Sequence, residues 1–292
     1  MRKMSKFKTY TISGVTIGGA PGKNPVVLIG CLFYSGHDIV EDNVKGIFDK
    51  ERAIDLVNKV IECEEKYRIP GMIDIVSEGP KACVKYLDFI VDRYPGPIML
   101  DGFFDSRMAG LKRAEEMGIM DRLVYNSIWL NPPEELEVIR EVKVQNTVIF
   151  SFDSATQVCD AARRYMLVTT GLKEGKKGLI EQAKDLGIKN LLIDNVLTDY
   201  TSLADAIEAN IMMKSQLGYP VGCGPANISY HISKFELKKV TRPVREAALV
   251  GAAQLFSDFL LYGPIEQAEV NYSAASIIHQ VKTNLNVDFT EF

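Results

Sequence analysis

The stretch Pro97-Ile98-Met99-Leu100-Asp101 is a short apolar run that ends in a carboxylate. The pattern returns in Leu123-Val124-Tyr125-Asn126 and in Leu191-Leu192-Ile193-Asp194. Short apolar runs between amphipathic segments are typical of buried parallel strands, whose carboxyl ends meet at one edge of the sheet. We therefore expect three strands of one parallel sheet, each of which ends in a polar residue at the same level.

Five further apolar runs extend this series along the chain. The eight expected strands are Val26–Leu32, Met72–Val76, Ile98–Leu100, Leu123–Tyr125, Thr147–Phe150, Leu191–Ile193, Pro220–Cys223 and Phe259–Tyr262. Amphipathic segments alternate with them, and the expected helices are Glu51–Tyr67, Pro80–Arg93, Ser106–Met117, Pro133–Val142, Gly178–Leu186, Ser202–Leu217, Val244–Phe256 and Ala274–Lys282.

The alternation of strand and helix sets the expected fold class. Eight such units in 292 residues average about 36 residues, close to the size of one βαβ unit. No Pro-, Gly- or Ser-rich linker interrupts the series. The sequence predicts an α/β fold, a single (β/α)8 TIM barrel that forms one domain over residues 1–292. A doubly wound sheet would alternate in the same way, but it would not require eight strands.

The N-terminal segment predicts a β-hairpin. Tyr10–Ile12 and Val15–Ile17 alternate in polarity on either side of the turn-forming pair Ser13-Gly14. Because the hairpin precedes the first barrel strand, we expect it to cover the bottom of the barrel.

Composition and charge narrow the function classes. The chain has 34 Lys and Arg against 38 Asp and Glu, a net charge of -4, so it carries no overall basic field for nucleic acid. Its five cysteines are scattered without a C-x-x-C pair, which favours reduced thiols. No apolar run is long enough to span a bilayer. The sequence therefore predicts a cytoplasmic protein without a membrane segment.

The polar residues after the strands are the candidate site. Carboxylates accept hydrogen bonds and amides both donate and accept, so together they suit the flat edge of a pteridine or purine. The alternative interpretation is that each residue caps the helix or turn that follows it. The main candidates are Asp101, Asn126, Asp194 and Asn227, and further candidates are Ser127, Asp153 and Glu266.

Other motifs are incomplete. The histidines, His37, His231 and His279, lack partners at metal-ligand spacing, so no metal site is expected. The segment Gly222–Asn227 nearly matches a dinucleotide-binding loop, but Asn227 replaces its third glycine. The chemistry is therefore expected to depend on the acids and amides at the barrel mouth.

Several blocks resemble a known family. Gly14-Val15, Gly18-Gly19 and Pro21-Gly22 are followed by Phe33-Tyr34, His37, Ile39-Val40, Lys45–Asp49, Asn126-Ser127-Ile128 and Leu260–Glu266. Together they resemble the H-subunit family of tetrahydromethanopterin S-methyltransferase over nearly the whole chain. The chain is also similar to bacterial relatives of that family, which act as methylcorrinoid:tetrahydrofolate methyltransferases, for example in glycine betaine demethylation.

The resemblance implies roles for individual residues. Pterin-binding methyltransferase barrels hold the pterin with Asp, Asn, Asp and Asn after strands three, four, six and seven, and the matching residues here are Asp101, Asn126, Asp194 and Asn227. The Glu that some relatives carry after strand one is absent, because the chain has Gly30-Cys31-Leu32-Phe33 there. The corrinoid-binding pattern D-x-H-x-x-G is also absent.

The expected function is methyl transfer between a methylcorrinoid and N5 of tetrahydrofolate, with Asn227 as the catalytic residue near N5. No cofactor is expected to be tightly bound. Tetrahydrofolate is the co-substrate, and the corrinoid arrives free or on a partner protein. A homodimer is expected. The alternatives are a non-catalytic or tetrahydromethanopterin-specific subunit of a larger complex, and a dihydropteroate synthase-like enzyme, which would need Lys and Arg at the mouth for pyrophosphate.

Overall fold

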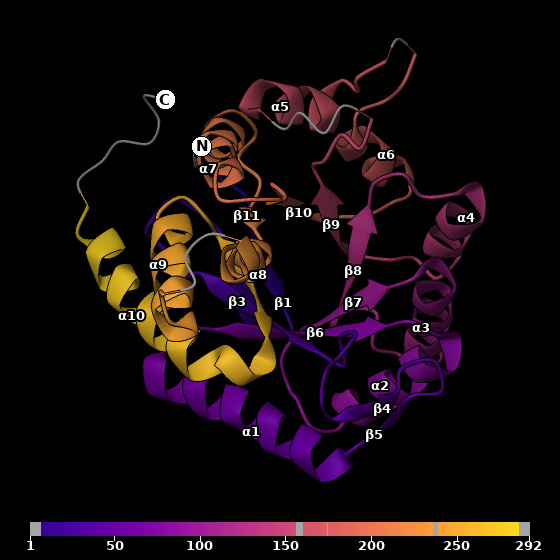
Figure 1. Cartoon of the computed structure of the whole chain (residues 1–292). Helices are drawn as coiled ribbons and strands as arrows, with labels where there is room; N and C mark the ends of the chain where they lie inside the picture. Colours follow the sequence, from indigo (N-terminus) through magenta and orange to yellow (C-terminus); the bar gives the residue numbers. More distant parts are fainter. Residues whose placement is uncertain (1–6, 156–159, 174, 236–238, 286–292) are drawn as a thin grey trace.

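The computed structural model describes residues 7–155, 160–173, 175–235 and 239–285, without the side chains of residues 231–235. Its centre is a closed barrel of eight parallel strands (Figure 1). In barrel order these are β3 (Val27–Leu32), β6 (Gly71–Ser77), β7 (Ile98–Gly102), β8 (Leu123–Ile128), β9 (Asn146–Phe150), β10 (Asn190–Asp194), β11 (Val221–Cys223) and β12 (Phe259–Pro264). The predicted TIM barrel is confirmed.

Helices cover the outside of the barrel (Figure 1). Those that correspond to predicted helices are α1 (Lys50–Tyr67), α2 (Pro80–Val91), α3 (Phe104–Glu116), α4 (Pro133–Glu141), α6 (Leu179–Asp185), α7 (Ser202–Leu217), α9 (Arg242–Gln254) and α10 (Ala268–Thr283). None of the helices in the described part of the chain is long and apolar enough to cross a membrane. The four described cysteines, Cys31, Cys63, Cys83 and Cys223, are free thiols, and Cys159 lies outside the described residues.

Several elements were not predicted. They are α5 (Ala161–Thr169), α8 (Pro225–Phe235), the 3-10 turn η1 (Ile265–Gln267) and a small hairpin of β4 (Val40–Asp42) and β5 (Ile47–Phe48). The predicted start of the last helix at Ala274 is wrong, because α10 begins at Ala268. Each of these helices places a polar residue on its buried face, Arg164 in α5, Ser229 in α8 and Asn271 in α10. Such residues weaken the apolar periodicity by which helices are recognised, although α3, α4, α7 and α9 also contain buried polar residues and were predicted.

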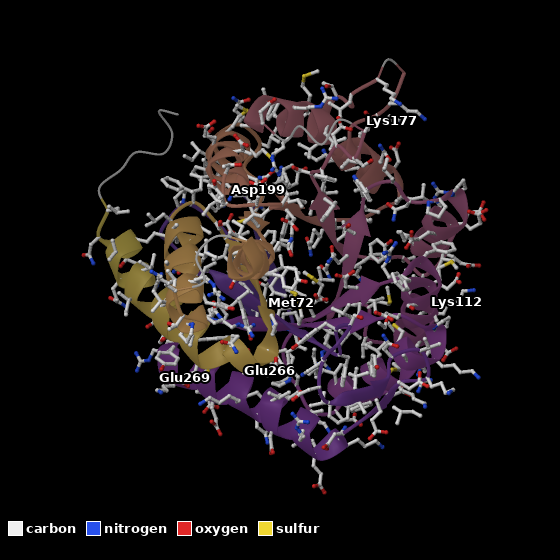
Figure 2. The ribbon with its side chains drawn as sticks, in the orientation of Figure 1. Met72, Lys112, Lys177, Asp199, Glu266 and Glu269 are labelled. Carbon is white, nitrogen blue, oxygen red and sulfur yellow. The ribbon has the colours of Figure 1, made fainter. Side chains whose placement is uncertain are left out.

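The interior of the barrel is filled with apolar side chains from alternate strand residues. Figure 2 shows Met72 near the barrel axis, surrounded by other side chains. The inner cluster comprises Val27, Ile29, Met72, Met99, Val124, Val148, Leu192 and Phe259, together with Ile12 and Ile17 from the N-terminal hairpin. The residues between them on each strand face outward and pack under the helices.

The N-terminal hairpin closes the bottom of the barrel, as predicted. Its strands are β1 (Thr9–Ile12) and β2 (Val15–Gly18), which pair antiparallel. The backbone N–H of Lys8 donates to the carbonyl of Gly218, just before β11, and Ser13 Oγ donates to the carbonyl of Pro95, just before β7. Ile17 is completely buried beneath the inner cluster. The amino ends of the strands are thereby sealed.

This seal predicts a large stability cost for Ile17→Ala. Truncation of a buried isoleucine leaves a cavity and lowers the free energy of unfolding by about 2–5 kcal/mol. Ile47→Ala is the matched control, since Ile47 is 43% exposed, and we expect a change of about 0.5 kcal/mol or less. Urea unfolding followed by circular dichroism measures both. Equal, small effects of the two substitutions would show that the hairpin does not close the barrel.

Candidate functional site

A layer of polar side chains lies directly above the apolar inner cluster, at the carboxyl ends of the strands. Alternate residues of a strand face the same side, so the residue two positions beyond each inner apolar residue also faces the barrel axis. Applied to Ile29, Met72, Met99, Val124 and Leu192, this rule gives the five inward-facing polar residues Cys31, Asp74, Asp101, Asn126 and Asp194. We call these five residues the polar layer.

Asp101 and Asn126 are joined within the polar layer. Asn126 Nδ2 donates to Asp101 Oδ2 over 3.1 Å, and the backbone N–H of Gly102 donates to Asp101 Oδ1 over 2.6 Å. Gly102 has φ of 130°, and a Cβ there would lie 2.0 Å from the carbonyl oxygen of Ser77. Only glycine fits this bend, which aims the amide at the carboxylate. The orientation of Asp101 is therefore fixed by the fold.

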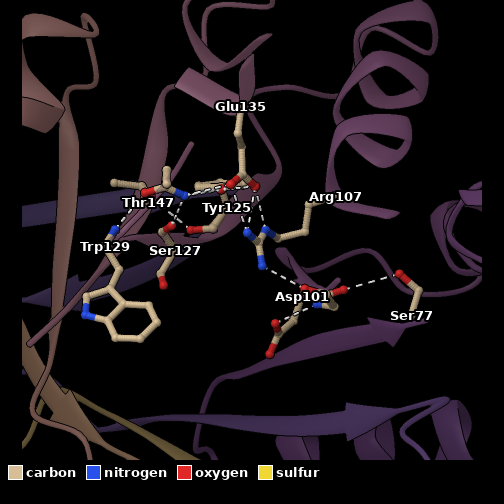
Figure 3. A network of polar contacts seen from close by, with 10 residues as sticks. Ser77, Asp101, Arg107, Tyr125, Ser127, Trp129, Glu135 and Thr147 are labelled. Carbon is tan, nitrogen blue, oxygen red and sulfur yellow. Dashed lines mark hydrogen bonds and ion pairs between the residues drawn. The ribbon is translucent and has the colours of Figure 1, made fainter. Parts of the chain in front are cut away.

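A buried ion pair supports these two strand ends from behind (Figure 3). The Arg107 guanidinium binds both oxygens of Glu135, with Nε–Oε1 at 2.8 Å and Nη2–Oε2 at 3.0 Å. Its Nη1 donates to the carbonyl of Gly102 over 2.7 Å, and the hydroxyl of Tyr125 donates to Glu135 over 2.6 Å. Glu135 is completely buried. One guanidinium thus links the end of β7 to α4 behind β8.

Asp74 is a member of the polar layer that sequence analysis missed. Its side chain is buried, Cys31 Sγ donates to its Oδ2 over 3.3 Å, and its Oδ1 has no hydrogen-bond partner among the described residues. Burial, and then the charge of Asp101, raises the pKa of Asp74 well above its usual value. The signal was present in the sequence, because an acid inside an apolar strand is rarely buried without a role.

Asp194 is a predicted site residue whose charge depends strongly on its surroundings. Burial raises its pKa to about 7, while the nearby Arg164 guanidinium lowers it and the charge of Asp101 raises it. The guanidinium is held by the carbonyls of Ser151 and Val196. Asp194 Oδ1 is buried and has no hydrogen-bond partner within the described part of the chain. This acid therefore changes charge near neutral pH.

Asn227 does not sit at a strand end. It lies in the first turn of α8, is exposed, and its Nδ2 donates to the carbonyl of Leu197 over 3.0 Å. That bond ties α8 to the loop after β10. Asn227 lines a cleft beside the polar layer, and Phe150, the inward residue of β9 that pairs in register with Asp194, lines the same cleft.

The three further candidates have other surroundings. The backbone carbonyl of Ser127 accepts from Asn131. Asp153 forms an ion pair with Arg163 of α5, with Nε–Oδ2 at 2.7 Å. Glu266, in η1, accepts from the hydroxyl of Tyr34 over 3.0 Å. None of these three side chains belongs to the polar layer.

Glu266 also belongs to a group that sequence spacing missed. His37, Asp38 and Glu266 lie close enough together to hold a metal ion. However, His37 Nδ1 accepts the backbone N–H of Phe33 over 3.2 Å, so the ring proton of the neutral imidazole is on Nε2. Nε2 lies 3.1 Å from Glu266 Oε1. A protonated Nε2 that faces a carboxylate is a hydrogen-bonding arrangement.

Comparison with known proteins identifies the family. Residues 5–290 match the family described as tetrahydromethanopterin S-methyltransferase MtrH subunit. The H subunit of this methyltransferase from Methanocaldococcus jannaschii is 35% identical over 290 residues, covering 92% of this chain and 89% of the relative. That of Methanopyrus kandleri is 33% identical over 300 residues, covering 96% and 92%. The chain belongs to the MtrH subunit family.

Solved structures agree with the fold of this MtrH-family chain. Dihydropteroate synthase from Coxiella burnetii, solved with pteroic acid, superposes with a TM-score of 0.63 at 16% identity, covering 94% of this chain and 98% of that one. The Yersinia pestis enzyme gives 0.62 at 15% identity, with 95% and 100% covered. At these identities the likeness concerns the fold alone. The family assignment itself confirms the resemblance inferred from sequence and, with it, the methyltransferase class.

The raised pKa of Asp194 predicts a pH-dependent stability for this MtrH-family chain. Between about pH 4 and pH 7 the folded state keeps a proton that the unfolded state has lost, so the free energy of unfolding falls as the pH rises through this window. We expect the free energy of unfolding of Asp194→Asn to fall by roughly 2–4 kcal/mol less over this window than that of the unmodified chain. Urea unfolding at a series of pH values measures it.

Asp121→Asn is the matched control, because Asp121 is exposed. The control should retain the full pH dependence of the unmodified chain. If Asp194→Asn retains it as well, Asp194 is ionised throughout the window and its raised pKa is wrong.

Proposed function

We propose that this chain transfers a methyl group between a methylcorrinoid and N5 of a reduced pterin, with tetrahydrofolate as the pterin. The observation that carries the proposal is the polar layer, in which three acids and an amide face the axis of a barrel from the MtrH family. The curated relatives are named for tetrahydromethanopterin. A subunit specific for that pterin is the second candidate, and binding measurements with both pterins separate the two.

The unpartnered oxygens of the polar layer suit the pyrimidine edge of a pterin. Asp74 Oδ1 and Asp194 Oδ1 are buried without partners among the described residues. A buried acceptor without a donor is unfavourable, and the amino and ring N–H groups of a pterin supply donors. Binding would therefore satisfy groups that the free barrel leaves unsatisfied. Asp101 can also accept further bonds, because a carboxylate has about four acceptor positions.

The raised pKa of Asp74 adds a donor to this set. A protonated carboxyl donates one hydrogen bond and still accepts, so Asp74 complements the acceptors Asp101 and Asp194. A pterin edge presents both N–H donors and the acceptors N1 and O4. A layer that contains donors and acceptors matches such an edge better than three carboxylates alone.

Methyl transfer by displacement depends on alignment. When the methyl moves to the pterin, the N5 lone pair attacks the methyl carbon, the electrons of the cobalt–carbon bond remain on cobalt, and N5 releases its proton to water. The rigid barrel holds the reacting groups in alignment, and this alignment removes a large part of the barrier for such reactions. Asn227 would lie near N5, where an amide can either donate or accept as the charge on N5 changes.

The partners remain predictions. The corrinoid would arrive free or on a separate corrinoid protein that covers the open mouth. For the expected homodimer, the surface to test lies on α9 and α10, where the apolar side chains of Val244, Ile277 and Val281 are exposed. An apolar groove between the same two helices continues this surface.

Titration calorimetry with Asp101→Ala tests pterin binding. Loss of a charged acceptor should weaken tetrahydrofolate binding by about 1.5–3 kcal/mol, which is about 10- to 150-fold in Kd. Asp105→Ala is the matched control, since Asp105 is exposed in the next helix. Unchanged affinity in a folded Asp101→Ala protein would exclude Asp101 from the site. Binding of tetrahydromethanopterin alone by the unmodified chain would establish the second candidate.

Asn227→Ala tests the catalytic step. If the amide follows the charge on N5, it stabilises the transition state more than the ground state, so kcat and kcat/KM should fall together while the pterin KM stays nearly constant. We expect a fall of about 10²-fold or less, because N5 develops less charge than an oxyanion. Steady-state kinetics with methylcobalamin measures it. A raised KM at unchanged kcat would make Asn227 a binding residue only.

A further inference from the structure

An aromatic cleft opens beside the polar layer. Its volume is about 510 Å³, a size that suits part of a small organic ligand. The lining residues are Trp129, Phe150 and Phe152 on one side, Val196, Leu197 and Thr198 from the loop after β10, and Asn227 and Tyr230 from α8. Of these residues, only Asn227 takes part in the proposed methyl transfer, so the aromatic wall has a role still to be assigned.

The aromatic wall is held in place before any ligand binds. The rings of Trp129 and Phe150 meet edge to face with centroids 5.4 Å apart, and those of Phe150 and Phe152 are 6.2 Å apart. Trp129 Nε1 donates to the carbonyl of Phe152 over 2.7 Å, and the Trp129 backbone N–H donates to Asn131 Oδ1 over 2.7 Å. Figure 3 shows Trp129 at the edge of the network that supports β8.

The cleft is continuous with the site through two residues. Phe150 lies on the inner face of β9, level with Asp194, and Asn227 lines the same cleft. In a reduced pterin, N5 is bonded to C6, which carries the side chain. If Asn227 lies near N5, the substituent on C6 therefore starts beside Asn227, which lines the cleft.

We propose that this cleft binds the arylamine group that tetrahydrofolate and related pterins carry on C6, an inference that rests on the proposed function. Aromatic rings prefer offset-stacked or edge-to-face contacts, and the rings of Trp129, Phe152 and Tyr230 line the cleft. The amide of Asn227 provides polar atoms for the amine. The polar layer recognises the pterin ring, and the aromatic cleft recognises its aryl substituent.

The test compares two ligands that share the reduced ring. Tetrahydrofolate carries the aryl group, whereas 6-methyltetrahydropterin has only a methyl group on C6. Calorimetry on Tyr230→Ala should show tetrahydrofolate binding weakened by about 3- to 10-fold, with 6-methyltetrahydropterin affinity unchanged. Tyr230 is 64% exposed, and circular dichroism of the Tyr230→Ala protein verifies that it is folded. Leu130→Ala is the control, because Leu130 is 66% exposed and does not line the cleft.

Trp129 supplies a second readout in the unmodified chain. It is the single tryptophan, so its fluorescence reports on the cleft. Tetrahydrofolate should change this fluorescence more than 6-methyltetrahydropterin does when both are saturating, after correction for ligand absorption.

The outcomes separate this inference from the proposed function. If the unmodified chain binds both compounds equally well, or if Tyr230→Ala weakens both equally, the aryl site is wrong while pterin binding stands. If Tyr230→Ala leaves both affinities unchanged but raises the KM for methylcobalamin, the cleft belongs to the corrinoid and the aryl site is again wrong. If the unmodified chain binds neither pterin, the proposed function and this inference fail together.

Discussion

Closure of a parallel sheet into a barrel is the constraint on which the rest of this structure depends. Each strand can present only alternate side chains to the axis, so the interior consists of stacked layers. Here one layer is apolar and the next is polar. On five strands the inward-facing side chain changes from apolar to polar two residues further along the strand. Asp74, Asp101 and Asp194 are therefore close to one another because the strands are closed, and their shared burial raises the pKa of each.

The polar layer is unfavourable to bury, and the structure supports it from outside the barrel. Glu135 is completely buried and Arg107 largely so, and the pair makes charge-assisted contacts to the end of β7 and to Tyr125 of β8. A buried pair of this kind stabilises little by itself, but loss of either partner leaves an uncompensated charge. The ion pair acts by positioning, because it holds in place the two strand ends that carry Asp101 and Asn126.

The fold could be predicted because the pattern of an apolar strand followed by a helix is repeated along the chain. The features that were missed depend on single residues. Eight apolar runs indicate a barrel even if one boundary is wrong, and polar residues that end those runs indicate the mouth. Asp74 was missed because it lies inside a strand rather than after it, two residues beyond Met72. The helices α5 and α8 and the start of α10 were missed, and each of them carries a buried polar residue: Arg164, Ser229 and Asn271.

The hairpin at the amino ends of the strands has a consequence for the order of events. Ile12 and Ile17 fill that end of the barrel, so the barrel is closed there. A molecule that reaches the polar layer must therefore enter and leave at the carboxyl ends of the strands. If the proposed methyl transfer takes place there, the reactant bound deeper in the barrel binds first and leaves last, so the closed end sets the order in which the two reactants bind.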